Sequence, residues 1–364
     1  MPQAIRLSWR RMTMVAAGRG TGTGLSRRGF GRLAAAGTGF LALGRPALAQ
    51  AVPIRLLLDW RLEGLSALFL AAQEKGYFGA EGLDVVIEPG VGSRLVPSRI
   101  AAGEFDAGFG DINALVRLRD GKPGYDLKAV MMVHDRPPFA VIGRRSRGIT
   151  AMPASLEGRK LGAPAADASF AQWPLFKTLN RIDDSRIRLE TIGFAVREPM
   201  LASGEVDGIF GFGPSATAIL TARGVPADDI VVLTMADHGV VLYGNAVMVS
   251  PKLAADQPGA VRGLVRALIR GMREVSTHPD AAVQMLGRRS DAAQPEVERQ
   301  RLAAMLQQNV LTPHVREHGL GGLDPARWQQ ALDQLAMVQP LRDRAKAGDA
   351  FTPAFLPAKE ERLF

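Results

Sequence analysis

Apolar residues between positions 52 and 250 fall in short continuous runs that alternate with stretches of helical spacing. Apolar runs of four to eight residues bounded by Gly, Pro or Asp are typical of buried strands, and apolar residues three and four positions apart are typical of helices. We expect strands at 52–58, 83–87, 127–133, 139–143, 160–163, 187–192, 230–235 and 243–250, with helices between most of them. This alternation indicates an α/β fold with mostly parallel sheets covered on both faces.

One helix-to-strand element occurs twice. Residues 101–111 read AAGEFDAGFGD and residues 202–212 read ASGEVDGIFGF, with six of eleven positions identical. In each copy a Gly ends a helix, an acidic pair follows, and an apolar run containing Gly predicts a strand that another part of the chain approaches closely. Chance similarity of two ordinary α/β units is the alternative. Two copies this far apart favour two lobes of similar build over a solenoid, which needs a short period.

The order of the elements predicts how the chain divides between the two lobes. The polar, irregular stretch 144–155 is expected to cross from the first lobe to the second, and 243–250 to return. The first lobe then holds residues 51–143 and 245–364, and the second holds 144–244. From residue 258 onward apolar residues at helical spacing predict C-terminal helices that pack as core. Two crossing segments imply a cleft between the lobes.

Polar and aromatic residues follow the predicted strands at the ends that face this cleft. Ligands of open α/β sheets bind beyond the carboxyl ends of the strands, where the strand order reverses. The candidates for ligand contact are Asp59, Trp60, Gly92, Ser93, Arg94, Asp111, Asn113, Asp167, Ser169, Phe170, Phe212, Tyr243 and Asn245. Asp111 and Phe212 close the two copies of the repeat, so we expect them to face one ligand from opposite sides.

Several candidates also have a purely structural interpretation. Trp60 can stack on a planar ligand while Asp59 binds its polar edge, or it can be a core residue at the rim. Ser93, after a Gly-Val-Gly turn, can bind an anion or simply cap a helix. Arg94 can clamp an anion or remain solvated. His134 is interpreted as a rim residue with satisfied hydrogen bonds.

The net charge of +9 arises almost entirely at the N-terminus. Residues 1–50 hold eight Arg and no acidic residue, which leaves 37 basic and 36 acidic residues in the rest of the chain. A nearly neutral folded part removes the main support for nucleic-acid binding.

The first fifty residues have the features of an export signal. Residues 26–30 (SRRGF) resemble a twin-arginine motif, 33–43 form a weakly apolar segment, and 47–49 (ALA) resemble a cleavage site, with cleavage near Ala49. A disordered basic tail is the alternative, and Met12 or Met14 can replace Met1 as the start. No later segment has the length and apolar character of a membrane span, so a protein that is not membrane-inserted is expected.

The chain contains no cysteine, which excludes disulfides, thiolate metal sites and cysteine nucleophiles. His314 and His318 have the spacing of metal ligands on a helix, but no third ligand accompanies them. No catalytic triad, phosphate-binding loop or pair of catalytic carboxylates is found. We therefore expect no metal, no cofactor and no catalytic residues; an enzyme exported around a cofactor and a sensor lobe are the competing classes.

Several motifs together resemble one family. They are Leu58-Asp59-Trp60, Gly76-Tyr77-Phe78, the A-x-G-E-x-D element of the repeat, Tyr243-Gly244-Asn245 and the helices at 258–286. In this order and spacing they resemble the SsuA/THI5-like (NMT1-like) periplasmic substrate-binding proteins of ABC importers for sulfonates, taurine, nitrate and thiamine-pyrimidine precursors. The pyrimidine-precursor branch continues with an Asn and a His near the places where this chain has Glu63 and Ser66, so Glu63 joins the candidate ligand contacts.

The resemblance implies a two-lobed type II periplasmic binding fold that closes about a hinge. It also implies a small-molecule ligand, an ABC permease with its ATPase as partners, a periplasmic location and a monomer. The aromatic candidates favour a planar heterocycle or aromatic acid, and a sulfonate or nitrate is the alternative. Eukaryotic relatives that consume their own residues to make the pyrimidine need a cysteine-rich motif, so that chemistry is not expected here.

Overall fold

The first lobe is built on a five-stranded sheet. A computed structural model describes residues 51–121 and 124–364, and the predicted export signal lies outside them. The sheet has the order β2-β1-β3-β10-β4, in which β10 runs antiparallel to both of its neighbours. Its strands are β1 (Val52–Leu57), β2 (Leu83–Glu88), β3 (Ala107–Asp111), β4 (Lys128–Met132) and β10 (Asn245–Val249).

The second lobe repeats this topology. Its sheet has the order β7-β6-β8-β5-β9, with β5 antiparallel to β8 and β9. The strands are β5 (Phe139–Arg144), β6 (Lys160–Ala163), β7 (Arg188–Thr191), β8 (Gly208–Phe212) and β9 (Ile230–Thr234). In each sheet the four parallel strands therefore lie in the order second, first, third and fourth, with the reversed strand between the third and the fourth. The α/β prediction is confirmed, and the duplicated element marks the third strand of each sheet.

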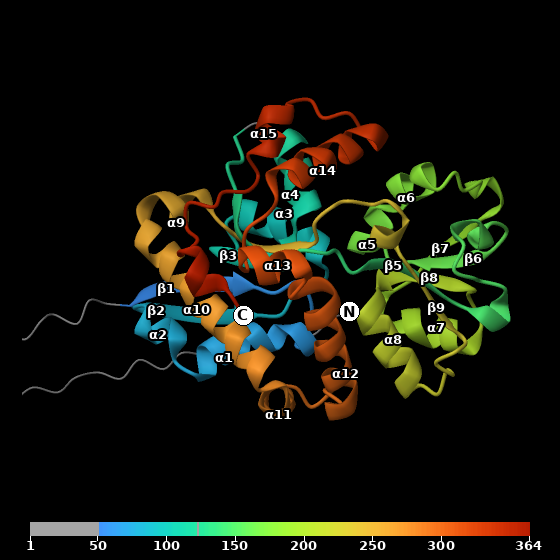
Figure 1. Ribbon diagram of the computed structural model, residues 1–364, viewed down its shortest axis with the longest axis horizontal. Coiled ribbons are helices and arrows are strands. Elements are labelled where there is room, and N and C mark those ends of the chain that lie inside the picture. Colours follow the sequence, from blue (N-terminus) through green and yellow to red (C-terminus); the bar gives the residue numbers. More distant parts are fainter. Residues whose placement is uncertain (1–50, 122–123) are drawn as a thin grey trace, which may run out of the picture. The chain divides into compact units, whose positions relative to one another are not determined.

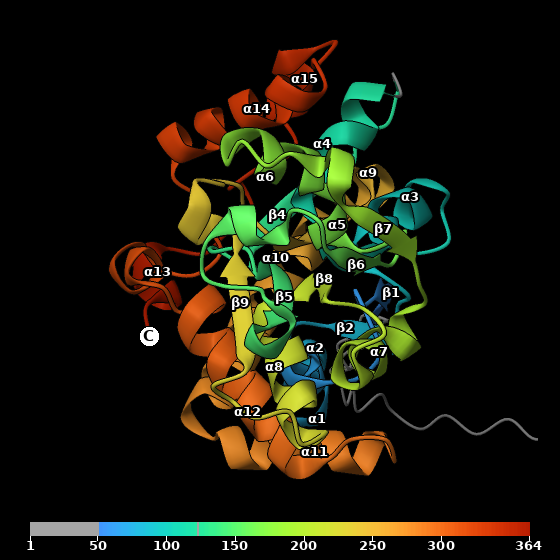
Figure 2. The ribbon, with the colours of Figure 1, turned by 90° about the vertical axis from the view of Figure 1, so that its right-hand side faces the viewer.

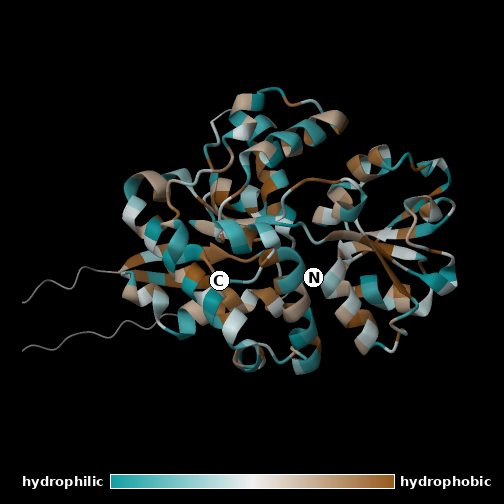
Figure 3. Cartoon of the chain, in the orientation of Figure 1, coloured by the Kyte–Doolittle hydropathy of each residue, from teal (hydrophilic) through white to brown (hydrophobic). Residues whose placement is uncertain are grey.

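Helices cover both faces of each sheet (Figures 1 and 2). In β1 alternate residues face opposite sides: Ile54 and Leu56 join one core cluster and Leu57 another. Figure 3 shows apolar strands between helices with polar outer faces. The helices are α1 (Ala67–Glu74), α2 (Tyr77–Ala80), α3 (Val96–Ala101), α4 (Ile112–Gly121), α5 (Ala168–Ala171), α6 (Trp173–Leu179), α7 (Arg197–Ser203) and α8 (Gly213–Ala222).

The C-terminal helices contact both lobes. α12 packs against α8 of the second lobe, and α14 packs against α6. In the part of the chain that the structure describes, no helix has the length and apolar character needed to cross a bilayer. The C-terminal elements are α9 (Pro251–Asp256), α10 (Pro258–Thr277), α11 (Pro279–Arg289), α12 (Pro295–Met305), a π-helical turn (Leu306–Val310), α13 (Pro313–His318), α14 (Pro325–Val338) and α15 (Arg344–Gly348).

The second acidic residue of the repeat has a structural role in both copies. The Asp106 carboxylate accepts a hydrogen bond from the backbone N–H of Arg55 in β1 (2.9 Å), and the Asp106 N–H donates back to the Arg55 carbonyl (3.0 Å). Asp207 and Lys160 make the same pair of bonds in the second lobe, at 2.9 and 2.8 Å. Each Asp therefore joins the first strand of its sheet to the third, which explains why it recurs.

The first crossing between lobes lies earlier than the sequence predicts. The prediction counts residues 139–143 in the first lobe, but β5 pairs with β8 and β9 of the second sheet. The crossing is therefore residues 133–138, and 144–155 lie within the second lobe. An apolar strand of this length does not reveal in its sequence which sheet it joins. The chain enters the first sheet again at Asn245, where β10 begins.

One arginine of the C-terminal region braces both crossing segments. The guanidinium of Arg327, in α14, donates to the backbone carbonyls of Asp135 and Leu242 at 2.7 Å each and to that of Val241 at 3.0 Å. It also lies over the ring of Tyr243, 4.0 Å from its centroid. Because Asp135 belongs to the first crossing and residues 241–243 to the second, Arg327 links the two strands of the hinge.

Candidate functional site

A small cavity lies between the carboxyl ends of the strands of the two lobes. Its volume is about 60 Å³, and both lobes line it. The first lobe contributes the ends of β1 and β2, and the second contributes the ends of β6, β7 and β8. The lining residues are Asp59, Trp60, Glu63, Gly92, Ser93, Ala166, Asp167, Ala168, Phe194, Arg197, Phe212 and Ser215. We call this the front cavity.

Two aromatic rings meet across the front cavity. The indole of Trp60, after β1, lies 4.6 Å (centroid to centroid) from the ring of Phe194, after β7, with their planes tilted by 49°. Phe212 ends β8 and forms a third aromatic wall. Aromatic side chains offer flat apolar surface at little cost in side-chain entropy and pair favourably with other rings. The geometry suits a planar ligand inserted between the lobes.

Asp59 supplies a carboxyl group beside these rings. Its Oδ2 accepts a hydrogen bond from the amide of Asn245 in β10, at 2.9 Å. Burial, followed by repulsion from Glu63, raises the pKa of Asp59 from 3.8 to about 7, although Asn245 and nearby backbone N–H groups oppose the rise. Near neutral pH this side chain therefore exists in both protonation states and can donate as well as accept a hydrogen bond.

His134 lies at a second, inner cavity that shares Asp59, Trp60, Glu63, Phe212 and Ser215 with the front cavity. This cavity has a volume of about 30 Å³. The backbone N–H of Asn245 donates to Nδ1 of His134 at 3.3 Å, so the neutral ring carries its proton on Nε2. Nε2 is buried and has no partner among the described residues. Burial also lowers the pKa of His134 to about 3, which keeps this donor uncharged in ordinary buffers.

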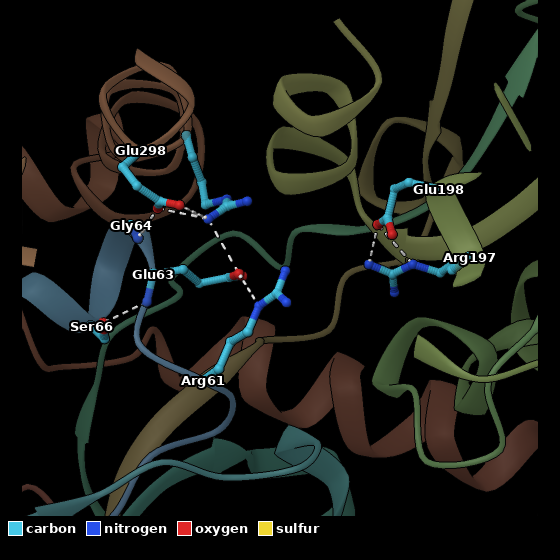
Figure 4. A network of polar contacts seen from close by, with 8 residues as sticks. Arg61, Glu63, Gly64, Ser66, Arg197, Glu198 and Glu298 are labelled. Atoms are coloured by element: carbon cyan, nitrogen blue, oxygen red, sulfur yellow. Dashed lines mark hydrogen bonds and ion pairs between the residues drawn. The ribbon is translucent and has the colours of Figure 1, made fainter. Parts of the chain in front are cut away.

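Arg197 is the cation of the second lobe that faces the front cavity, and two carboxylates already hold it. Its guanidinium contacts Glu198 at 2.6 Å and Asp167 at 3.1 Å. Gly211 of β8 makes room for this group, because a Cβ there would lie 2.9 Å from the guanidinium nitrogen. Burial raises the pKa of Asp167, and Arg197 opposes the rise, so the cluster carries a net negative charge only while Asp167 is ionised. Figure 4 shows Arg197 and Glu198 with their hydrogen bonds.

Glu63 belongs to a neutral network in the first lobe (Figure 4). Its carboxylate lies 3.2 Å from Arg61 and 3.2 Å from Arg301 of α12. Arg301 also pairs with Glu298 at 2.6 Å, and Glu298 accepts a hydrogen bond from the backbone N–H of Gly64. Two arginines and two glutamates therefore balance, and they fix the loop that follows Trp60 against α12.

The structure brings seven of the fourteen predicted site residues to the front cavity. They are Asp59, Trp60, Glu63, Gly92, Ser93, Asp167 and Phe212. Asn245 does not line the front cavity, but its side-chain amide donates a hydrogen bond to Asp59, which does. Asp167 both lines the cavity and caps α5, because its carboxylate accepts from the N–H of Phe170. Ligand contact and helix capping are therefore compatible roles for one residue.

Three predicted site residues, Ser169, Phe170 and Tyr243, are used in packing and line neither the front nor the inner cavity. Ser169 is fully buried and donates from its hydroxyl to the carbonyl of Gly211, which ties α5 to β8. Phe170 packs on Phe210. Tyr243 is buried under α14, where its hydroxyl accepts from the N–H of Asp324. Ser169 and Phe170 follow β6, and Tyr243 lies just before β10 in the second crossing segment, but all three side chains are used in packing.

Asp111, Asn113 and Arg94 line a different cavity from Phe212. Asp111 and Phe212 therefore do not face each other across one cavity, and the expectation that they contact one ligand stays a prediction. Residue identity at the end of a strand does not show to which side of the sheet the side chain turns. Oδ1 of Asp111 accepts from the N–H of Asn113 at the start of α4.

The predicted site omits several residues that line the two cavities, among them Phe194, Arg197, Ser215 and His134. Phe194 follows β7, Ser215 follows β8, and Arg197 begins α7. Ligands bind beyond the carboxyl ends of the strands, so a search of the segment after every strand of the second lobe would have included these residues. His134 follows β4 and was given the alternative interpretation of a satisfied rim residue, whereas its Nε2 has no partner among the described residues. Residues 51–121 and 124–364 contain no group of three metal-ligating side chains, and His314 and His318 lie in α13.

Two relatives match most of the chain. The riboflavin-binding protein RibY of Chloroflexus aurantiacus is 25% identical over 297 residues, which is 80% of this chain and 82% of RibY. The formylaminopyrimidine-binding protein of Halalkalibacterium halodurans is 25% identical over 313 residues, 82% of this chain and 89% of that protein. A shorter match, 31% over 110 residues, is to a Saccharomyces cerevisiae 4-amino-5-hydroxymethyl-2-methylpyrimidine phosphate synthase and covers 32% of it.

A solved structure shares the fold. The alkanesulfonate-binding protein SsuA of Xanthomonas axonopodis pv. citri superposes with a TM-score of 0.63 at 16% identity, over 84% of this chain and 99% of SsuA. The two-lobed periplasmic binding fold is thereby confirmed. The model of the family described as NMT1/THI5 like matches residues 65–282, more than half of the sequence. The chain belongs to the NMT1/THI5-like family.

Proposed function

We propose that the protein is a solute-binding protein that captures a planar nitrogen heterocycle in the front cavity. One observation carries the proposal: the carboxyl group of Asp59, whose pKa burial raises to about 7, lines the same cavity as the rings of Trp60, Phe194 and Phe212. The rings stack on the faces of the ligand, and Asp59 binds the ligand edge in the same plane. The site binds its ligand and releases it unchanged.

The protonation behaviour of Asp59 suits such an edge. An aminopyrimidine presents a ring nitrogen beside an amino group, and a carboxyl group can make two parallel hydrogen bonds to this pair. A carboxylate binds the ring when its nitrogen is protonated, and a carboxylic acid binds it when the nitrogen is free. His134 offers a further donor, from Nε2, to an acceptor that reaches the inner cavity. The same groups match the alternating donors and acceptors of a flavin edge.

The charge around the front cavity disfavours a sulfonate or nitrate ligand. Arg197 is neutralised by Glu198 and Asp167, and Arg301 by Glu298 and Glu63. With Asp59 the side chains that face the cavity therefore sum to a negative charge. An anion would have to displace these carboxylates from their arginines, which leaves buried charges unpaired at a cost of several kcal/mol. A neutral or cationic ring has no such cost.

A binding role is supported by the two relatives that match about four fifths of this chain, since both are named for ligands with planar nitrogen-containing rings. We further propose that the two lobes, built on the two sheets and joined at residues 133–138 and 239–244, close on the ligand. The closed form then docks on an ABC permease outside the cytoplasm, after export by the twin-arginine signal. The ligand favours closure because it contacts both lobes only in the closed state.

Titration calorimetry with riboflavin, 4-amino-2-methylpyrimidine, taurine and nitrate tests the proposal. We expect saturable one-to-one binding of a heterocycle and none of the two anions. Trp60→Ala should weaken heterocycle binding at least tenfold, whereas Phe170→Ala, an aromatic residue of the second lobe outside both cavities, should not. Binding of taurine or nitrate alone, or conversion of a heterocycle into product, would contradict the proposal.

A further inference from the structure

A second and larger cavity lies between the lobes on the other side of residues 92–94. Its volume is about 520 Å³, against about 60 Å³ for the front cavity. Arg94, Asp111 and Asn113 line it from the first lobe, Gln172 from the second, and the end of α14 closes it. We call it the rear cavity.

Two residues that line the rear cavity, Asp111 and Asn113, each hold a buried acceptor atom without a partner among the described residues. Oδ2 of Asp111 and Oδ1 of Asn113 make no hydrogen bond to any described residue, and both residues are only 1% exposed. Their other polar atoms are used: Oδ1 of Asp111 accepts from the N–H and the amide of Asn113, and that amide also donates to the carbonyl of Tyr243. A buried acceptor without a donor costs about 1–3 kcal/mol. A ligand group that donates hydrogen bonds would satisfy both atoms.

The partition between the front and rear cavities consists of contacts between the lobes. Arg94 donates to the carbonyl of Ala165 at 2.9 Å, and a Cβ on Gly92 would lie 3.2 Å from the carbonyl oxygen of Ala166. Ser93 and Ala168 line the front cavity, and their near neighbours Arg94 and Ala171 line the rear one. The partition is thus thin, and it exists only while the lobes are together.

Entry of a ring into the front cavity also opens this partition. A dry cavity that holds benzene has a volume of roughly 150 Å³, so the front cavity admits a ring only when Trp60 and Phe194 separate. Gly92 lies against the same loop, since a Cβ there would be 3.8 Å from the ring of Phe194. The movement that admits a ring therefore joins the two cavities into one.

We propose that the ligand has two parts: a planar ring in the front cavity, and a chain rich in hydroxyl or amino donors in the rear cavity. Asp111 and Asn113 bind the donors of the chain, and Arg94 closes over the junction by its bond to Ala165. This inference rests on the proposed function, because it requires the ring site. It selects polyhydroxylated or amino-substituted heterocycles over rings without a chain.

Two flavins with one ring system test the inference. Riboflavin carries a polyhydroxylated chain, and lumiflavin carries a methyl group in its place. We expect riboflavin to bind at least tenfold more tightly than lumiflavin. Asp111→Asn keeps the oxygen that caps α4 but replaces Oδ2 with an amide donor, so it should reduce the advantage of riboflavin and leave lumiflavin unchanged. The free energies of unfolding of wild type and Asp111→Asn, measured by urea denaturation, are the control for folding.

The outcomes separate this inference from the proposed function. Equal affinity for the two flavins, or an equal loss of both in Asp111→Asn, would overturn the two-part ligand and leave the ring site standing. The two-part ligand would also be overturned, with the ring site left standing, if riboflavin did not bind and 4-amino-2-methylpyrimidine bound wild type and Asp111→Asn equally. If neither flavin nor the pyrimidine binds, the proposed function fails and the inference fails with it.

Discussion

The indole of Trp60 and the ring of Phe194 lie 4.6 Å apart, although one follows β1 of the first sheet and the other follows β7 of the second. This contact joins the two lobes at the front cavity. Any planar ligand that enters between the lobes must part these two rings and replace their contact with its own. The pair is therefore a direct reporter of ligand entry.

The first prediction concerns Phe194. Phe194→Ala should weaken binding of a planar heterocycle about tenfold or more, because one stacking face is lost. Phe194→Tyr, which keeps the ring, should retain most of the affinity. Calorimetric titration of the three proteins with one ligand measures this. Equal affinity of Phe194→Ala and wild type would show that the ligand does not lie between the two rings.

Asp59 is predicted to destabilise the unliganded protein at alkaline pH. Burial raises its pKa from 3.8 to about 7, so the folded protein holds a proton that the unfolded chain releases between these values. The contribution of Asp59 to stability therefore falls as pH rises from about 4 to 7 and stays low above 7. Asp59→Asn can still accept from Asn245, and it should raise the free energy of unfolding at pH 8 by roughly 1–3 kcal/mol.

Urea denaturation of wild type and Asp59→Asn at pH 4.5 and pH 8 measures this difference. The gain should be large at pH 8 and small at pH 4.5. A gain of equal size at both pH values would mean that the substitution acts by packing and not by removal of a buried charge.

His134 should contribute the opposite dependence. Its pKa is lowered from 6.5 to about 3 by burial, so the unfolded chain binds a proton that the folded protein excludes between these values. Its contribution is fully favourable above pH 6.5 and is lost as pH falls toward 3. His134→Gln should flatten the fall in stability between pH 6 and pH 4 by up to about 1.4 kcal/mol per pH unit.

The comparison uses the slope of unfolding free energy against pH, so that the packing cost of the substitution cancels. Asp59 and Asp111, which lie near the same strand ends, remain in both proteins. Parallel slopes for wild type and His134→Gln would contradict the assigned burial of a neutral imidazole.

Arg327 is predicted to control the hinge. Arg327→Ala leaves the carbonyls of Asp135, Val241 and Leu242 without their charged donor, and hydrogen bonds to charged groups contribute about 1.5–3 kcal/mol each. We expect a loss of stability of a few kcal/mol and a changed apparent affinity, although Arg327 lies outside the front cavity. Arg344→Ala, an exposed arginine paired with Asp333, is the matched control. A loss of stability with unchanged affinity would limit Arg327 to a structural role.

Much of the fold could be predicted from the sequence because buried strands and helices place apolar residues at regular intervals along the chain. The duplicated element correctly located the third strand of each sheet, and its recurrent Asp turned out to join strands and not to bind a ligand. The point at which the chain crosses could not be predicted. β5 is as apolar as its neighbours, and only its hydrogen bonds to β8 and β9 assign it to the second sheet.

The site was predictable to the extent that it depends on strand ends. Trp60 and Phe212 both follow strands and both reach the front cavity. Tyr243 also lies next to a strand end, yet its ring is buried beneath α14 and carries the guanidinium of Arg327. Which side a side chain takes depends on elements more than eighty residues away. Sequence near the site does not contain that information.

The most direct test of ligand-driven closure uses the absence of cysteine from the sequence. Spin labels at Val86→Cys on β2 and Leu189→Cys on β7 occupy exposed positions on the edge strands furthest from the crossing segments in the sheet order. Double electron–electron resonance then measures the distance between the lobes. We expect saturating riboflavin or 4-amino-2-methylpyrimidine to shorten and narrow the distance distribution, and Trp60→Ala to need at least tenfold more ligand for the same change. A distribution that stays the same while the ligand is bound would contradict closure of the two lobes on a planar heterocycle.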